Sequence, residues 1–360
     1  MIKTWLPDIQ FKLGEQSAYG PIALEIARDS LRLQQIKVSA EGVSCHESLE
    51  LPLPGSRNAL LAEPAALTTL LKQALKQGRF SGRRLITALP ADKVRLHSLM
   101  YRCSPEESDA EAILKLMEER LPNGLSDQII DYIPVHRMQG GTEKLALVAS
   151  AHRGDIHIIL DALSTTGYRI DALEINPLAI LRLIQWQAGE SLHQHCLALN
   201  FAERNTYISL ISNSQLLADQ RVDVGASKIL SDISEALEVP VERCREWLNR
   251  YGVIAREDYS EAAREFCVVA GQITQRCMMP LIDAIDKMNT FLAAETRGAQ
   301  CSIIYLLGSL SDWPGLAELL ERAADLPIHT LKPGDGMLQT DKDQAMWPVC
   351  TGLALRDHAS

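Results

Sequence analysis

The chain has 360 residues, of which 46% are hydrophobic, with a net charge of -10 and a pI of about 5.5. This length is typical of two or three domains, and the hydrophobic content is sufficient for packed cores. Phosphate and anionic lipid are bound by clustered Lys and Arg, so the acidic balance argues against nucleic acid as a partner and against direct membrane binding.

The eight cysteines include no C-x-x-C pair, and most of them lie inside apolar runs. This pattern indicates buried free thiols in a reducing compartment rather than a disulfide framework. The first residues lack the apolar run of a signal peptide, and no window approaches the ~18 uninterrupted apolar residues of a membrane-spanning helix. We therefore expect a cytoplasmic protein that does not insert into the membrane.

The first part of the chain predicts a sheet and one helix. β-prone runs predict strands at about 22–26, 31–39, Ser48–Pro54 and 85–89. Pro64 opens a helix in which apolar residues recur at helical spacing on one face.

Residues 91–165 predict a compact α+β unit, which we interpret as an inserted subdomain. Strands are expected at 94–101, 128–136 and 144–151, and a helix at about 156–163. A further helix over 110–121 is predicted to start from a capping box at Ser104–Glu107.

The second half of the chain predicts another hairpin, over Leu197–Ile211, and then a third strand over Gln215–Val224. The next predicted elements are helices near 226–237 and 241–251, a long helix over 258–292, a strand over 301–307, a helix over 316–323 and a final helix. Pro280 leaves open whether the long segment is one helix or two.

The two hairpins have nearly the same layout. The segment Ala23–Leu33 aligns with Ala198–Ile208 as a strand, an acidic or amide residue near its end, an alanine in the loop and a second strand. This suggests two related half-domains facing each other, with chance similarity as the alternative. The expected domains are a first half-domain at 1–90 plus 166–190, an insert at 91–165, and a second half-domain at 191–360 with a helical subdomain at about 226–298.

Several segments together resemble the PilM family of type IV pilus assembly proteins. They are Ile129–Tyr132, Leu145–Ala151, Gly167, Glu174, Ile304–Ser309, Pro314–Leu316 and Gly352–Arg356. The resemblance extends from about residue 20 to 357, and relatives in MSHA-type pilus biogenesis and the cytoplasmic part of GspL share the pattern. It implies an α/β, actin-like two-lobed fold similar to FtsA, with a nucleotide cleft between the half-domains and an inserted α+β subdomain.

The nucleotide loops of this family are altered here. Where the first loop is close to Asp-Ile-Gly-Ser in the family, this chain has Glu25–Arg28, and where the second is close to Asp-Ile-Gly it has Asn200–Glu203. Both glycines have become alanine, which disfavours a tight loop, and Asn200 supplies no negative charge to a metal. If Glu203 faces the phosphates, two like charges about 4 Å apart repel by roughly 4 kcal/mol at a dielectric of ~20.

The adenosine side differs too, because the family's Ala-Glu-x-x-Lys is replaced by Cys244–Leu248 and its Gly-Gly by Gly308-Ser309. If a nucleotide is retained, the candidate binding residues are Glu25, Arg28, Ser30, Asn200, Asn205, Thr206, Gly225, Gly308 and Ser309. In that case Arg28 contacts phosphate and Gly225, at a helix N-terminus, favours an anion. The alternative for Glu25 is a structural carboxylate. No catalytic residue is assigned.

The strand entry His193–Cys196 resembles a metal cluster, but alternation places Cys196 on the opposite face from the two histidines. No distant Cys or His pair completes four ligands, so we expect no metal site.

The resemblance implies a cytoplasmic scaffold that binds the N-terminal tail of a PilN-like inner-membrane protein and through it reaches the inner membrane. Other pilus components are further partners that the family implies. We expect no cofactor and no hydrolysis, and the alternative is an actin-like ATPase that binds ATP with Mg²⁺. A third interpretation, a membrane-tied filament former similar to FtsA, is disfavoured because Asp357–Ser360 is too short and polar for a membrane helix.

Overall fold

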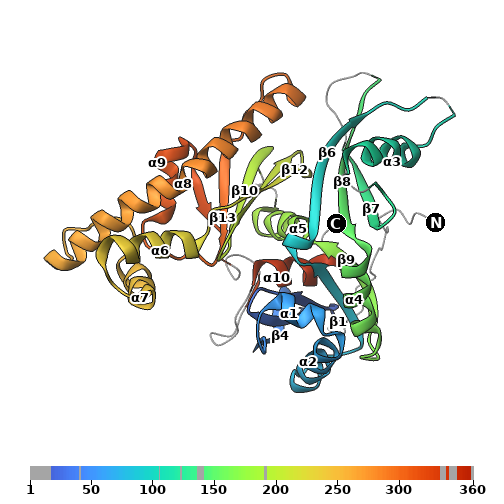
Figure 1. Cartoon of the computed structure of the whole chain (residues 1–360), viewed down its shortest axis with the longest axis horizontal. Coiled ribbons are helices and arrows are strands. Elements are labelled where there is room, and N and C mark those ends of the chain that lie inside the picture. The colour runs from blue at the N-terminus through green and yellow to red at the C-terminus, as the bar shows by residue number, and fades with distance from the viewer. Residues whose placement is uncertain are drawn as a thin grey trace. The chain divides into compact units, whose positions relative to one another are not determined.

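The computed structural model describes residues 18–39, 42–104, 106–121, 124–135, 142–189, 193–332, 338–339 and 347–357. The chain forms two compact units, each considered below by itself (Figure 1). Unit 1 takes Met1–Lys93, Gly154–Gln187 and Pro333–Ser360, and unit 2 takes Val94–Arg153 and Ala188–Lys332.

Unit 1 contains a mixed sheet in the order β15-β4-β3-β2-β5-β9, with β1 paired to β3. Its strands are β1 (Ala18–Tyr19), β2 (Ile22–Ile26), β3 (Ser30–Ser39), β4 (Gly42–Pro52), β5 (Arg84–Leu89), β9 (Arg169–Ile175) and β15 (Leu338–Gln339). Because β3 and β4 pair along almost their whole length, β4 begins earlier than the short strand predicted over Ser48–Pro54.

The helices of unit 1 are α1 (Arg57–Ala62), α2 (Pro64–Gln77), α4 (Arg153–Ser164), α5 (Asn176–Ala188) and α10 (Pro348–Ala354). The predicted start of α2 at Pro64 is observed, and the helix buries its apolar face. The last helix, α10, lies against β2 and β3 rather than with residues 191–332 (Figure 1).

A tight backbone contact fixes α10. A Cβ at Gly352 would lie 1.9 Å from the Ala179 carbonyl oxygen, so only glycine allows α10 and α5 to approach this closely. The Arg182 guanidinium donates to the Gly352 carbonyl at 2.7 Å. Two arginines, Arg182 and Arg356, also pair with the buried carboxylate of Glu174, at 3.2 and 2.6 Å.

Unit 2 contains a sheet in the order β12-β11-β10-β13-β14. Its strands are β10 (His195–Phe201), β11 (Thr206–Ser212), β12 (Gln215–Val222), β13 (Ile303–Gly308) and β14 (Ile328–Thr330). The pairings from β12 to β14 are antiparallel, antiparallel, parallel and parallel, as they are from β4 through β3, β2 and β5 to β9 in unit 1. The two sheets therefore share one strand topology.

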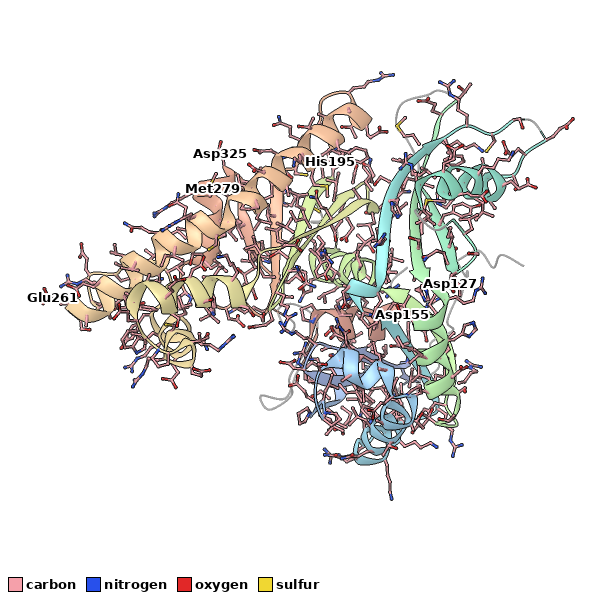
Figure 2. The ribbon with its side chains drawn as sticks, viewed as in Figure 1. Asp127, Asp155, His195, Glu261, Met279 and Asp325 are labelled. Atoms are coloured by element: carbon pink, nitrogen blue, oxygen red, sulfur yellow. The ribbon has the colours of Figure 1, made fainter. Side chains whose placement is uncertain are left out.

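The helices that accompany this sheet are α6 (Ala226–Leu237), α7 (Val241–Tyr251), α8 (Glu261–Thr296) and α9 (Leu316–Ala324). The long segment is a single helix, α8, with Pro280 inside it. Glu261 marks the start of this helix in Figure 2, and Met279 on the same helix is 53% exposed.

A second, three-stranded sheet of unit 2 has the order β6-β8-β7, from β6 (Val94–Tyr101), β8 (Lys144–His152) and β7 (Gln128–Val135). Helix α3 (Asp109–Arg120) packs on it around a core that includes Leu99, Ile113, Met117 and Val148. The capping box is four residues later than predicted: Ser108 caps the helix and pairs with Glu111. The predicted cap at Ser104–Glu107 is wrong for that reason.

Candidate functional site

The first hairpin closes with the pair Ile26 and Leu31, and the loop between them carries Ala27 and Arg28. Neither loop residue is among the positive-φ residues of the described chain, so alanine fits this turn without strain. Arg28 is exposed at the loop. The loop is tied to the body of unit 1 by a 2.8 Å hydrogen bond from Leu53 N to the Asp29 carbonyl.

A row of charged side chains crosses three strands beside this loop. Glu25 on β2 pairs in register with Arg32 on β3, which pairs in register with Glu50 on β4. Glu25 Oε2 lies 3.8 Å from Arg32 Nη1, and Arg32 Nε donates to Glu50 Oε1 at 2.8 Å. Ser30, one of the predicted nucleotide-binding residues, donates its hydroxyl hydrogen bond to Glu50 at 2.6 Å. This hydroxyl therefore already has a protein carboxylate as its acceptor.

The surroundings of Glu25 are supplied by α1 and α10. The Arg57 guanidinium donates to the Ile26 carbonyl at 3.4 Å and pairs with Asp92, and the Arg32 guanidinium lies 5.5 Å from the centroid of the Trp347 ring. Burial raises the pKa of the Glu25 carboxyl, and the Arg32 charge opposes that shift only in part. Glu25 is thus a mostly buried carboxylate facing a guanidinium, which favours its structural role over a metal-binding one.

The second hairpin closes with Phe201 and Thr206, at the positions that correspond to Ile26 and Leu31 in the first. Ala202 N donates to the Asn205 carbonyl at 3.0 Å and closes the turn. Beside it, a Cβ at Gly308 would lie 2.1 Å from the Phe201 carbonyl oxygen and 2.7 Å from Asn200 Oδ1.

The polar candidates of unit 2 are likewise hydrogen-bonded to the protein. The Asn205 amide donates to Asp223 at 2.8 Å, and the buried Thr206 hydroxyl donates to the Val224 carbonyl at 2.7 Å. Ser309 donates to the Phe201 carbonyl from its backbone N at 2.9 Å and from its hydroxyl at 3.3 Å. The structure brings Asn200, Asn205, Thr206, Gly225, Gly308 and Ser309 together around one hairpin, where the Asn205, Thr206 and Ser309 side chains bond to protein acceptors.

The start of α6 at Gly225 packs directly on the second hairpin. A Cβ on it would lie 2.4 Å from the Arg204 carbonyl carbon, so glycine is needed for helix and hairpin to touch. The first backbone N–H groups of α6, from Ala226 and Ser227, donate to the Ala202 and Glu203 carbonyls at 3.3 and 2.8 Å. An external anion would find these donors occupied.

Sequence reasoning missed the partners that surround the two hairpins. Glu203 accepts from the Ser227 hydroxyl at 2.8 Å and pairs with Arg245 at 2.7 Å. Arg245 stands where the family motif has glutamate, and Leu248, where it has lysine, is fully buried. The sequence contained a signal for this pairing. Glu203 appears in the loop and Arg245 in the adenosine-side motif, and their opposite charges compensate each other.

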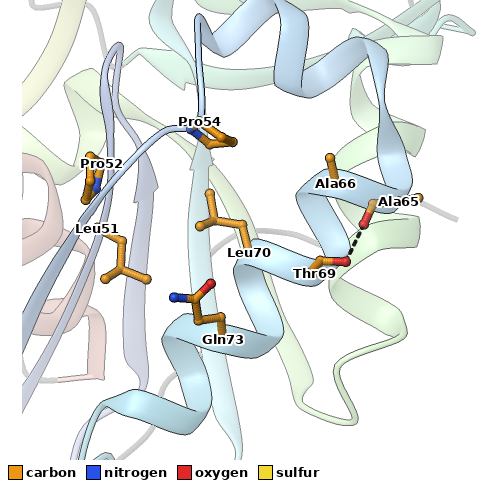
Figure 3. A pocket seen from close by; sticks show the side chains of 8 residues that line it. All are labelled: Leu51, Pro52, Pro54, Ala65, Ala66, Thr69, Leu70 and Gln73. Carbon is orange, nitrogen blue, oxygen red and sulfur yellow. Dashed lines mark hydrogen bonds between the residues drawn. The ribbon is translucent and has the colours of Figure 1, made fainter.

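A separate apolar groove of about 540 Å³ lies between the end of β4 and α2 (Figure 3). The lining side chains are Leu51, Pro52, Pro54, Ala65, Ala66, Thr69, Leu70 and Gln73. The Thr69 hydroxyl donates to the Ala65 carbonyl at 2.9 Å within the helix. None of the eight lining side chains is charged, so the groove does not suit a phosphate.

The histidines at the entry to β10 have hydroxyl neighbours. His193 Nδ1 lies 3.0 Å from the Ser302 hydroxyl, and His195 Nδ1 lies 2.8 Å from that of Ser212. Within the part of the chain that the structure describes, no group of three or more His, Cys, Asp or Glu side chains could hold a metal ion. No helix among the described residues has the length and apolar character to cross a bilayer.

No family model and no curated protein matches the sequence. Among solved structures, the chain is similar to a chain of the PilM–PilN type IV pilus biogenesis complex, with 22% identity, 95% of this chain and 99% of that chain covered, and a TM-score of 0.72. It is also similar to the ethanolamine utilization protein EutJ from Carboxydothermus hydrogenoformans, with 11% identity, coverages of 94% and 89%, and a TM-score of 0.51. The chain therefore has the PilM-like, actin-like α/β fold.

Proposed function

We propose that the chain is a scaffold of a type IV pilus or related secretion machine and captures the N-terminal tail of a PilN-like inner-membrane protein. The observation that carries the proposal is the fold shared over 95% of the chain with a member of the PilM–PilN complex. Capture of that tail would recruit the chain to the inner membrane. Under this proposal the chain works by binding a neighbour and not by hydrolysis.

The inserted sheet and α3 offer the kind of surface that an extended apolar tail requires. Peptides of this kind bind along a strand edge or in an apolar channel. Strand β7 pairs with β8 at one edge of the three-stranded sheet, and the large apolar side chain of Leu114, on the helix α3 that packs on this sheet, is 40% exposed. We infer that the tail lies against this subdomain.

The hydrogen bonds of both hairpins support a nucleotide site that has lost its function. Ser30, Thr206 and Ser309 each donate to protein acceptors, and Glu25 faces Arg32. A triphosphate would have to break these bonds, and each buried group left without a partner costs about 1–3 kcal/mol. We therefore propose that neither ATP nor Mg²⁺ is needed for capture of the tail.

The test is a titration of the purified full chain with a synthetic tail of the PilN-like protein encoded beside it, with a scrambled peptide as control. Leu114→Asp should weaken binding at least tenfold, because a charge would face the apolar tail. Met279→Asp, on the exposed side of α8, is the matched control and should bind as the wild type does (Figure 2). Absence of tail binding by the wild type would refute the proposal.

The alternative function, an actin-like ATPase, predicts a different result in a melting experiment. A ligand that binds the folded state raises Tm, by an amount that grows with its concentration relative to Kd. We expect no change of Tm with Mg-ATP. A rise of several degrees would favour the ATPase, whether or not the tail binds.

A further inference from the structure

Four hydrogen-bond donors from two helices converge on one residue of the second hairpin, Glu203. The Glu203 carboxylate accepts from the Ser227 hydroxyl of α6 at 2.8 Å and from Arg245 of α7 through Nη2 at 2.7 Å and Nη1 at 3.4 Å. The Glu203 backbone carbonyl accepts from Ser227 N at 2.8 Å. One hairpin residue therefore joins the start of α6 to the second turn of α7.

The negative charge of Glu203 also lies near the start of α6, where the helix itself has no acidic side chain. The positive end of a helix is stabilised by a nearby anion, yet the first turn of α6 contains no acidic residue. Arg245 adds a second positive charge, and the Glu203 carboxylate is the negative group that contacts both. The two side chains remain accessible, with 31% of Glu203 and 42% of Arg245 exposed.

We propose that Glu203 is a built-in anion, which fills an anion-binding position formed by the Arg245 guanidinium and the Ser227 hydroxyl. We call these three residues the Glu203 latch. The latch holds α6 and α7 against the β10–β11 hairpin without any bound ligand. This inference goes beyond the proposed function, because it holds whether or not the chain captures a tail.

The latch predicts chemical rescue by a small carboxylate. Glu203→Ala should lower Tm by about 2–4 °C, since a partly exposed charged contact of this size contributes little more. Sodium acetate should then raise the Tm of this variant more than sodium chloride does at equal ionic strength, because acetate can take the place of the lost side chain. In the wild type the difference between the two salts should be smaller, because only their general effect on protein stability remains.

Two further variants keep the test decisive. Arg245→Ala should lower Tm about as much as Glu203→Ala, and the double variant should be no less stable than either single one and should lose the preference for acetate. Glu246→Ala, an exposed carboxylate change on the same helix, is the control and should leave Tm and its salt response unchanged. A preference for acetate in Glu203→Ala that is no larger than in the wild type, or one that is equally large in the double variant, would overturn the proposal.

Discussion

Glu25 and Arg32 lie directly opposite each other across the β2–β3 hairpin, with 3.8 Å between Oε2 and Nη1. A fixed guanidinium is thus the cation nearest to the carboxylate that an actin-like nucleotide site would use for a metal. At the second hairpin the loop residue Glu203 supplies the anion and Arg245, from α7, supplies the cation. Each hairpin is neutralised within its own unit by a neighbouring side chain.

The buried carboxyl of Glu25 should give unfolding a specific pH dependence. Burial raises its pKa in the folded state, so the folded chain keeps this proton to a higher pH than the unfolded chain does. Its stabilising contribution is therefore complete at low pH, below the unfolded pKa of ~4.3, and is lost as pH rises through the folded value. Urea unfolding measured at a series of pH values above about 4.3 should show a flatter dependence for Glu25→Gln than for the wild type.

A second variant checks the sign. The charge of Arg32 lowers the pKa of Glu25, so Arg32→Gln should raise that pKa further and make the loss of stability with pH steeper. If Glu25→Gln and the wild type lose stability in parallel, the carboxyl is not the titrating group.

The Glu174 cluster should be the most sensitive ion pair in unit 1. Glu174→Gln leaves Arg182 and Arg356, which are 15% and 21% exposed, beside a neutral amide. Loss of one partner from a buried pair costs about 3–5 kcal/mol, so we expect a large drop in the free energy of unfolding by urea. Arg356→Ala should cost less, because Arg182 still neutralises the carboxylate.

An exposed pair provides the control for that experiment. Arg322 pairs with Glu318 on the surface of α9, with 68% and 49% of the side chains exposed. Arg322→Ala should change the free energy of unfolding by less than about 1 kcal/mol. Similar losses for Arg322→Ala and Glu174→Gln would show that burial does not set the value of the Glu174 cluster.

The start of α3 can be tested with two serine substitutions. Ser108→Ala removes a side chain that accepts from Glu111 N at 3.3 Å, and should cost about 1 kcal/mol by urea unfolding. Ser104→Ala should have little effect, because Ser104 lies before the helix and contributes its backbone N to Glu107. Equal losses would contradict the observed cap.

The elements of the fold could largely be predicted because local patterns determine them. Alternating apolar residues predicted both hairpins, and the alignment of Ile26 with Phe201 matches the closing pairs of the structure. The order β6, α3, β7 and β8 could also be predicted, from the turn residues and from the spacing of the apolar residues. By contrast, two serines lie before α3, and sequence alone favoured Ser104 because a proline follows it.

Contacts between distant segments were beyond sequence reasoning. The partners of Glu25 and Glu203 are set by strand register and by helix placement, which no local period reveals. The loop substitutions predicted altered nucleotide chemistry, which stays a prediction. They did not reveal that the Ser30 and Thr206 hydroxyls donate to Glu50 and to the Val224 carbonyl. The return of α10 to unit 1 had no local signal either.

The packing of Gly352 on Ala179 has a consequence for biosynthesis. The helix that covers β2 and β3 is synthesised after every described strand of unit 2, while the strands it covers are synthesised before them. Unit 1 therefore cannot finish folding before α10 has emerged, whereas the described strands of unit 2 all precede Pro333. A nascent chain stalled shortly before α10 should carry a folded unit 2 and an incomplete unit 1 that is open to chaperones and proteases.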